Sequence, residues 1–124
     1  MTSEPTLVHR WRTLLTSYNE IASHLERVLQ EAHGLGLGEF ETLDRLVTAS
    51  CEKRRMQELA ADMYLSQSAL SRTVARLEKN GLVRRELCQD DRRGVFVGLT
   101  DDGLRRHADA RATHRAVLAE HLDS

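Results

Sequence analysis

The sequence predicts a mostly α-helical domain with one small β-hairpin, and three observations support this prediction. Apolar residues make up 40% of the 124 residues and charged residues 30%, with a single proline, a composition typical of helical globular domains. Apolar positions recur every three or four residues over most of the chain, which indicates amphipathic helices. Two segments, 82–89 and 95–100, read instead as short strands, and the second alternates with a period of two.

Composition and charge exclude several classes of protein. No run of about 18 apolar residues is present, so we expect no membrane span. The first residues, MTSEPTLVHRWR, lack an apolar signal core, and two cysteines are too few for a disulfide framework; both points favour a cytoplasmic protein. Residues 51–100 hold 10 basic and 7 acidic side chains, whereas residues 1–50 hold 4 and 7. A basic middle suits a nucleic-acid partner if its charges gather on one surface.

A long first helix is expected over residues 8–32. Its apolar residues are spaced by three and four: Val8, Trp11, Leu14, Leu15, Tyr18, Ile21, Ala22, Leu25, Val28, Leu29 and Ala32. At 1.5 Å per residue this helix is roughly 37 Å long, longer than so small a domain can cover. A second copy of the chain is the simplest partner for its apolar stripe. Gly34 and Gly36 end the helix, and a second helix is expected over residues 37–47.

Residues 56–83 predict two short helices separated by a tight turn, which together form a helix-turn-helix. Tyr64 and Leu65 interrupt the helical pattern, Ser66 is a good N-cap for the second helix, and an Asn-Gly pair ends it. The inward face of the second helix holds Ala69, Leu70, Val74 and Leu77. A loop or short strand is expected just before this motif, over residues 51–55.

The two predicted strands form a hairpin joined at QDDRRG, residues 89–94. A hairpin that follows a helix-turn-helix is a wing. Arginine at its tip, Arg92 or Arg93, can enter a DNA minor groove, where a narrow groove concentrates negative potential. Asp91 can hold a neighbouring arginine by a charge-assisted hydrogen bond, and Gly94 lets the backbone turn or approach DNA closely. The alternative is a tip whose charges serve only solubility.

Thr100 caps a final helix, with two aspartates in its first turn, where carboxylates suit the helix dipole. The apolar residues of this helix are Leu104, Ala108, Ala112, Leu118 and Leu122.

The outward face of the helix that begins at Ser66 is polar. Glutamine can bond adenine, arginine can bond guanine, and serine adapts to either base. The candidates for reading bases in a major groove are therefore Ser66, Gln67, Ser68, Ser71 and Arg72. Arg76 and Lys79, farther along the helix, are better placed for backbone phosphates. The alternative is an ordinary solvated helix face.

The run LAADMYLSQSALSRTVARLEKNGLVRRELCQDDRRGVFVGLTDDG, residues 59–103, resembles the DNA-binding core of the MarR (multiple antibiotic resistance regulator) family. The shared order is a helix-turn-helix, LE-x-x-GLV-x-R, an Asp-Arg-Arg wing and LT-x-x-G. The resemblance implies one winged helix-turn-helix domain over residues 1–124. Its core spans residues 37–100, and long dimerisation helices flank it at residues 1–35 and 101–124.

The resemblance also implies a homodimer that regulates transcription from a pseudo-palindromic operator in double-stranded DNA. In that arrangement the helix from Ser66 reads the major groove, Arg93 inserts into the minor groove, and Asp91 pairs with Arg72. Family members usually continue beyond the point where this sequence stops, with another helix that completes the dimer interface. This departure bears on the dimer rather than on the DNA-binding module.

Family resemblance further implies a repressor released by a small phenolic or aromatic effector. The candidate pocket residues are Trp11, Leu14, Tyr18 and Phe40; ordinary core and interface packing is the alternative. Redox sensing remains open, with Cys88 a better candidate than Cys51 because four arginines lie near it in sequence.

No metal or cofactor is expected. His107, His114 and His121 recur every seven residues, too far apart on a helix to share one ion without other ligands; we expect them to be partly buried interface residues.

Three other functions are the alternatives to an effector-responsive DNA-binding regulator. An enzyme is disfavoured because no nucleotide loop, G-x-S-x-G or H-E-x-x-H motif is present. A winged helix that binds only proteins predicts an apolar exposed face on the second motif helix, and Gln67, Arg72 and Arg76 are the opposite. An effector-independent repressor or an architectural DNA-binding protein stays open.

Overall fold

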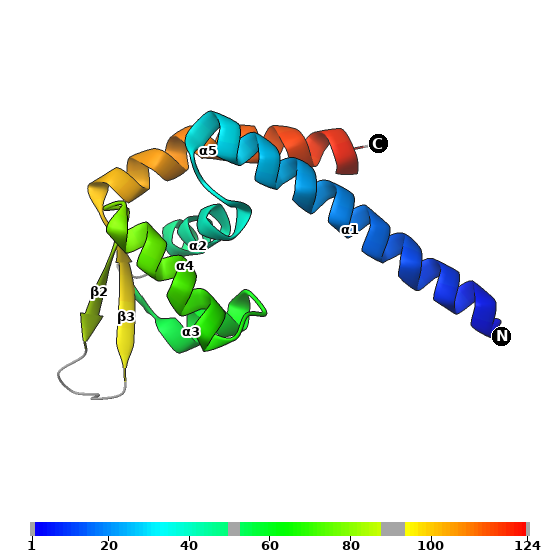
Figure 1. The fold of residues 1–124 in the computed structure, drawn as a ribbon, viewed down its shortest axis with the longest axis horizontal. Helices are drawn as coiled ribbons and strands as arrows, with labels where there is room; N and C mark the ends of the chain where they lie inside the picture. Colours follow the sequence, from blue (N-terminus) through cyan, green and yellow to red (C-terminus); the bar gives the residue numbers. More distant parts are fainter. Residues whose placement is uncertain (1, 50–52, 88–93, 124) are drawn as a thin grey trace.

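The computed structural model of this chain describes residues 2–49, 53–87 and 94–123. In chain order, the elements of this part are α1 (Glu4–His33), α2 (Leu37–Thr48), β1 (Lys53–Arg55), α3 (Met56–Asp62), α4 (Gln67–Lys79), β2 (Val83–Leu87), β3 (Val95–Leu99) and α5 (Asp101–Leu122) (Figure 1). This arrangement confirms the predicted fold class, a mostly helical winged helix-turn-helix with long helices at both ends.

Capping side chains and a glycine near the helix ends set where α1, α4 and α5 begin or end. Ser66 Oγ accepts the backbone N–H of Ala69 at 3.1 Å and starts α4. Thr100 Oγ1 accepts the N–H of Gly103 at 3.0 Å and starts α5, so each hydroxyl satisfies one of the N–H groups that a helix start leaves unpaired. After α1 the backbone turns at Gly34 with φ 67°, a conformation that glycine adopts without steric cost.

The three strands form one antiparallel sheet in the order β1-β3-β2. Strand β3 lies in the middle, and Val97 pairs with Arg54 on one side and with Arg85 on the other. The segment that the sequence leaves as a loop or short strand is therefore the third strand, β1, and it completes the base of the wing.

The core lies where α2, α4 and the C-terminal half of α1 meet α5 and the sheet. Its fully buried large side chains are Leu29, Leu35, Phe40, Leu43, Leu59, Leu70, Val74, Leu77, Leu82 and Val97. Residues 4–20 of α1 take no part in it, because every one of them is exposed and this half of the helix projects away from the body of the chain (Figure 1). None of the described helices is apolar enough over a sufficient length to cross a membrane.

The apolar residues from which the sequence predicts α5 are mostly exposed, and other residues of the helix are buried instead. Leu104 and Leu122 are 51% and 65% exposed, and Ala108 and Ala112 are exposed as well; of the five, only Leu118 is half-buried. The buried residues of α5 are Gly103, His107, Ala110, His114 and Val117. Small residues allow neighbouring backbone to approach α5 closely, and the two histidines have polar partners on α2.

Candidate nucleic-acid interface

Helices α3 and α4 form the predicted helix-turn-helix. The turn between them holds Tyr64 in the left-handed region, with φ 56°, and Leu65 donates its N–H to the carbonyl oxygen of Ala60 at 2.9 Å. The face of α4 that packs into the core consists of Leu70, Thr73, Val74 and Leu77. Because this face is buried, the opposite face of α4 is fixed toward solvent.

The outward face of α4 carries the side chains that the sequence singles out. The exposed ones are Gln67, Ser68, Arg72, Ala75, Arg76 and Lys79. Ser71 is half-buried, and the hydroxyl of Ser66 is engaged in capping the helix. Arg76 also donates to Thr73 Oγ1 at 3.3 Å. Short polar side chains thus occupy the N-terminal end of one face and cations occupy its C-terminal end.

The hairpin formed by β2 and β3 follows α4, and β2 packs against it. Gly94, the residue before β3, is buried rather than open at an outer surface. The predicted wing residues Asp91, Arg92 and Arg93, the brace between Asp91 and Arg72, and both cysteines, Cys51 and Cys88, lie outside the described residues.

A cavity of about 320 Å³ separates the N-terminal half of α4 from the hairpin. Its lining residues are Arg55, Met56, Gln57, Gln67, Ser71, Arg85, Gly94 and Val95. The outward face of α4 and the start of β3 therefore share one polar, cationic groove.

Residues 37–95 match the model of the MarR family. AbsC, a MarR family transcriptional regulator from Streptomyces coelicolor, is 34% identical, with a TM-score of 0.86 over 98% of this chain and 81% of AbsC. The chain belongs to the MarR family. Sco3205, a MarR family regulator from the same organism solved in complex with DNA, is 33% identical, with a TM-score of 0.89 over 98% of this chain and 76% of Sco3205.

Membership of the MarR family confirms the resemblance read from the sequence. A curated relative, the HTH-type transcriptional regulator YkoM of Bacillus subtilis, is 29% identical over 93 residues, which make up 75% of this chain. The chain spans 58% of the length of YkoM.

This MarR chain has a second cavity, of about 500 Å³, between α1, α2, α5 and the turn after α3. Its lining residues are Tyr18, Ile21, Ala22, Leu25, Leu37, Gly38, Glu41, Arg45, Met63, Tyr64, Leu65 and Leu118. Of the four predicted effector residues, Tyr18 alone lines it. Trp11 and Leu14 are 59% and 67% exposed farther along α1, and Phe40 is fully buried in the core, so the structure does not bring the four together.

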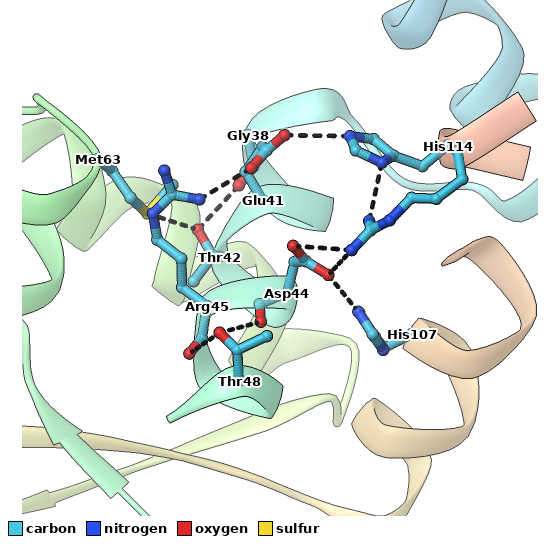
Figure 2. A network of polar contacts seen from close by, with 10 residues as sticks. Gly38, Glu41, Thr42, Asp44, Arg45, Thr48, Met63, His107 and His114 are labelled. Carbon is cyan, nitrogen blue, oxygen red and sulfur yellow. Dashed lines mark hydrogen bonds and ion pairs between the residues drawn. The ribbon is translucent and has the colours of Figure 1, made fainter. Parts of the chain in front are cut away.

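A polar network links carboxylates of α2, one of which lines this cavity, to histidines of α5 (Figure 2). It was not predicted from the sequence. His114 is 5% exposed and bonds Glu41 Oε1 through Nε2 at 3.2 Å; its Nδ1 lies 2.9 Å from Nη1 of Arg115. Arginine only donates, so Arg115 donates to Nδ1 of His114. His107 Nε2 lies 2.7 Å from Asp44 Oδ1.

Phe40 lies between the two histidines. Its ring stacks on His107 with centroids 5.3 Å apart and on His114 with centroids 4.5 Å apart. Arg115 also donates to Asp44, at 3.2 Å, and Arg45 pairs with the other oxygen of Glu41 at 2.9 Å. The histidines are therefore satisfied structural groups inside the chain. Within the described part, no three His, Cys, Asp or Glu side chains are placed to share a metal ion.

Both carboxyl groups of the network have lowered pKa values. The hydrogen bond from His114 is the main cause that holds the pKa of Glu41 below its ordinary 4.5, against the opposing effect of burial. Burial raises the pKa of Asp44, but the hydrogen bond from His107 and the charge of Arg115 outweigh it and leave this pKa below its ordinary 3.8. Each carboxylate is thus stabilised in the folded protein.

Acid is expected to weaken the fold through these two groups. Because each folded-state pKa lies below the unfolded value, the stabilisation is fully present above pH 4.5 and is lost as pH falls through the folded values. Asp44→Asn keeps the shape but cannot ionise. We expect it to cost about 1–3 kcal/mol at pH 7 and to flatten the fall in unfolding free energy below pH 3.8, the ordinary pKa of this carboxyl. Urea denaturation at several pH values measures both effects; superimposable pH profiles for the two proteins would contradict the assignment.

Proposed function

We propose that this chain is a dimeric, sequence-specific DNA-binding regulator of transcription that acts in the cytoplasm as a repressor on a pseudo-palindromic operator. One observation carries the proposal: the outward face of α4 is exposed, polar and cationic, and it stands next to the hairpin. The buried face of the same helix leaves no other surface of α4 for a partner. The complex of Sco3205 with DNA supports the same use of the fold.

The side chains of α4 divide into two groups by position. We assign base reading in the major groove to Gln67, Ser68, Ser71 and Arg72, with Ser66 at the cap, because glutamine, serine and arginine match the donor and acceptor pattern of base edges there. We assign phosphate contacts to Arg76 and Lys79, near the C-terminal end of the helix, where two exposed cations give salt-sensitive affinity.

The tip of the hairpin completes the proposed interface. Arg92 and Arg93, with Asp91 as brace and Gly94 just before β3, are proposed to meet the minor groove beside the site that α4 is proposed to read. The support is the order of the chain: β2 packs against α4, and β2 and β3 pair in register from Val83 with Leu99 to Leu87 with Val95.

The proposed dimer is built on the projecting half of α1. Its exposed large apolar residues are Leu7, Val8, Trp11, Leu14, Leu15 and Tyr18. Their spacing of three and four forms one stripe along the helix. Exposed stripes of this size mark interaction sites, and a second copy, joined through α1 and α5, places two α4 helices about one turn of DNA apart.

Release by a small phenolic or aromatic effector is proposed for the 500 Å³ cavity beside Tyr18, which apolar residues line together with Glu41 and Arg45. An effector-independent or architectural protein, and a redox response at Cys88, are the alternatives. Titrating the DNA complex with phenolic acids and, separately, with peroxide tells them apart: release by the first supports the effector, release by the second supports Cys88, and no release supports an effector-independent protein.

Gln67→Ala is expected to weaken binding to the preferred operator by about tenfold and to leave binding to unrelated DNA nearly unchanged, because one bidentate base contact contributes about 1–3 kcal/mol of discrimination. Lys79→Ala is the matched control. It should weaken both complexes alike and lower the salt slope by about one. Mobility-shift titrations of both duplexes measure this, and an equal loss on both duplexes for Gln67→Ala would reassign that residue to the backbone.

A further inference from the structure

Arg85 of strand β2 reaches across to the reader helix and holds it at two points. Its Nη2 donates to the carbonyl oxygen of Ser71 at 3.1 Å. Its Nε lies 3.6 Å from Glu78 Oε1, and its backbone N–H donates to Glu78 Oε2 at 3.2 Å. Resting on the proposed DNA function, we propose that Arg85 is a positioning residue for sequence recognition, which fixes the rotation of α4 relative to the wing without touching a base.

The spacing of the two attachment points explains why rotation is fixed. Ser71 and Glu78 are seven residues apart, two turns of one helix face and about 10.5 Å along its axis. One contact would hold α4 to β2 at a single place, whereas two contacts on the same face hold it over two turns and add to the core packing of α4 in defining its rotation. Base readout depends on rotation, because a turn of the helix carries each side chain away from its base edge.

The cavity beside α4 explains why such a tie is needed. Between Gln67 and Ser71 on α4 and Gly94 on the hairpin there is open space of about 320 Å³ instead of packed side chains. Arg85 lines this space and crosses it to reach Ser71. The guanidinium therefore takes the place of packing at the end of α4 that carries the proposed base readers.

The positioning role of residue 85 requires an arginine, and the neighbouring Arg84 offers a matched control. Lysine keeps the charge but is a point donor, so it cannot donate to the Ser71 carbonyl and also lie beside the Glu78 carboxylate as the planar guanidinium does. Arg84 precedes Arg85 on the same strand and points to the opposite face. Its Nε donates to Glu86 Oε1 at 2.9 Å, within its own strand. Arg84→Lys therefore matches Arg85→Lys in chemistry, charge and element.

The test compares the two variants with the wild type by fluorescence anisotropy, on the selected operator and on a scrambled duplex of equal length. For Arg85→Lys the ratio of the two affinities should fall about tenfold, with less than a twofold change on the scrambled duplex. Arg84→Lys should keep the wild-type ratio. An unchanged ratio in Arg85→Lys, or an equal loss on both duplexes, overturns the proposal. If the wild type binds the operator and the scrambled duplex equally well, the proposed sequence-specific function is wrong, and the inference that rests on it is wrong too.

Hydrogen exchange of the DNA-free protein gives an independent readout. Arg85→Lys and Glu78→Gln should both speed amide exchange across residues 67–75 at a melting temperature close to that of the wild type, and Arg84→Lys should not. Exchange that is unchanged in Arg85→Lys would show that α4 is held without the guanidinium and would overturn the positioning role, even if the variant binds DNA less well.

Discussion

Gly103→Ala is expected to lower the melting temperature by about ten degrees. A Cβ at this position would lie 2.0 Å from the carbonyl oxygen of Leu82 and 3.2 Å from Leu99 Cδ2. The first of these atoms is backbone and cannot turn aside as a flexible side chain can. Relieving the clash requires α5 to move off the segment after α4, at a cost of about 3 kcal/mol or more.

The clash also disturbs the start of α5. Leu82 O accepts the N–H of Thr100 at 3.2 Å, and the Thr100 hydroxyl in turn donates to Gly81 O at 2.6 Å. A displaced helix loses these contacts, which link the end of the helix-turn-helix to α5. The glycine of the LT-x-x-G motif is therefore required for close packing.

Gly38→Ala is the matched control for Gly103→Ala. It lies within helix α2, and an added Cβ there meets nothing within 4 Å, so this variant should be neutral or more stable by up to about 1 kcal/mol through helix propensity. Calorimetry or thermal circular dichroism measures both variants. Equal melting temperatures for Gly103→Ala and the wild type would mean that α5 does not approach Leu82 as closely as described.

Leu14→Glu is expected to abolish the dimer and to weaken operator binding by about 100-fold or more. Leu14 is 67% exposed in the single chain and lies in the middle of the apolar stripe of α1. A carboxylate there would be buried without a partner in the dimer, which is strongly unfavourable. Operator binding falls with it because the second half-site is no longer bound intramolecularly.

Thr13→Glu adds the same charge to the opposite face of α1 and should leave both the dimer and DNA binding intact. Light scattering distinguishes the chain mass of 14.1 kDa from twice that value, and anisotropy follows operator binding. A Leu14→Glu variant that keeps the doubled mass would show that α1 is not the dimer interface. A wild type that is itself monomeric would show the same.

The sequence predicts the order of elements well because local signals control them. Capping by Ser66 and Thr100, glycine at residues 34 and 81, and apolar residues at helical spacing all act within a few residues. The outward face of α4 follows from the same periodicity, since the positions opposite Leu70, Val74 and Leu77 must face away from the core.

The buried face of α5 could not be predicted in this way. His107 and His114 are buried because Asp44 and Glu41 lie opposite them, 63 and 73 residues earlier in the chain, and periodicity does not record distant partners. Two acids three apart on α2 and two histidines seven apart on α5 were the available signal. Phe40, predicted to line a pocket, is instead enclosed between these histidines.

The contact of Arg85 with α4 could not be predicted from the sequence for a related reason. In sequence Arg85 is one of two adjacent arginines at the start of a strand, and nothing local separates its role from that of Arg84. Only the packing of β2 on α4 places one guanidinium against Ser71 and turns the other toward Glu86.

The two α4 helices of the proposed dimer are expected to read DNA sequence, and this is tested by selecting bound duplexes from a random library. The protein is incubated with the library at two salt concentrations, and the bound duplexes are sequenced. We expect an inverted repeat with half-sites about 10 to 10.5 base pairs apart, enriched at both concentrations. Salt-sensitive binding without an enriched sequence, or no binding even at low salt, would contradict the claim.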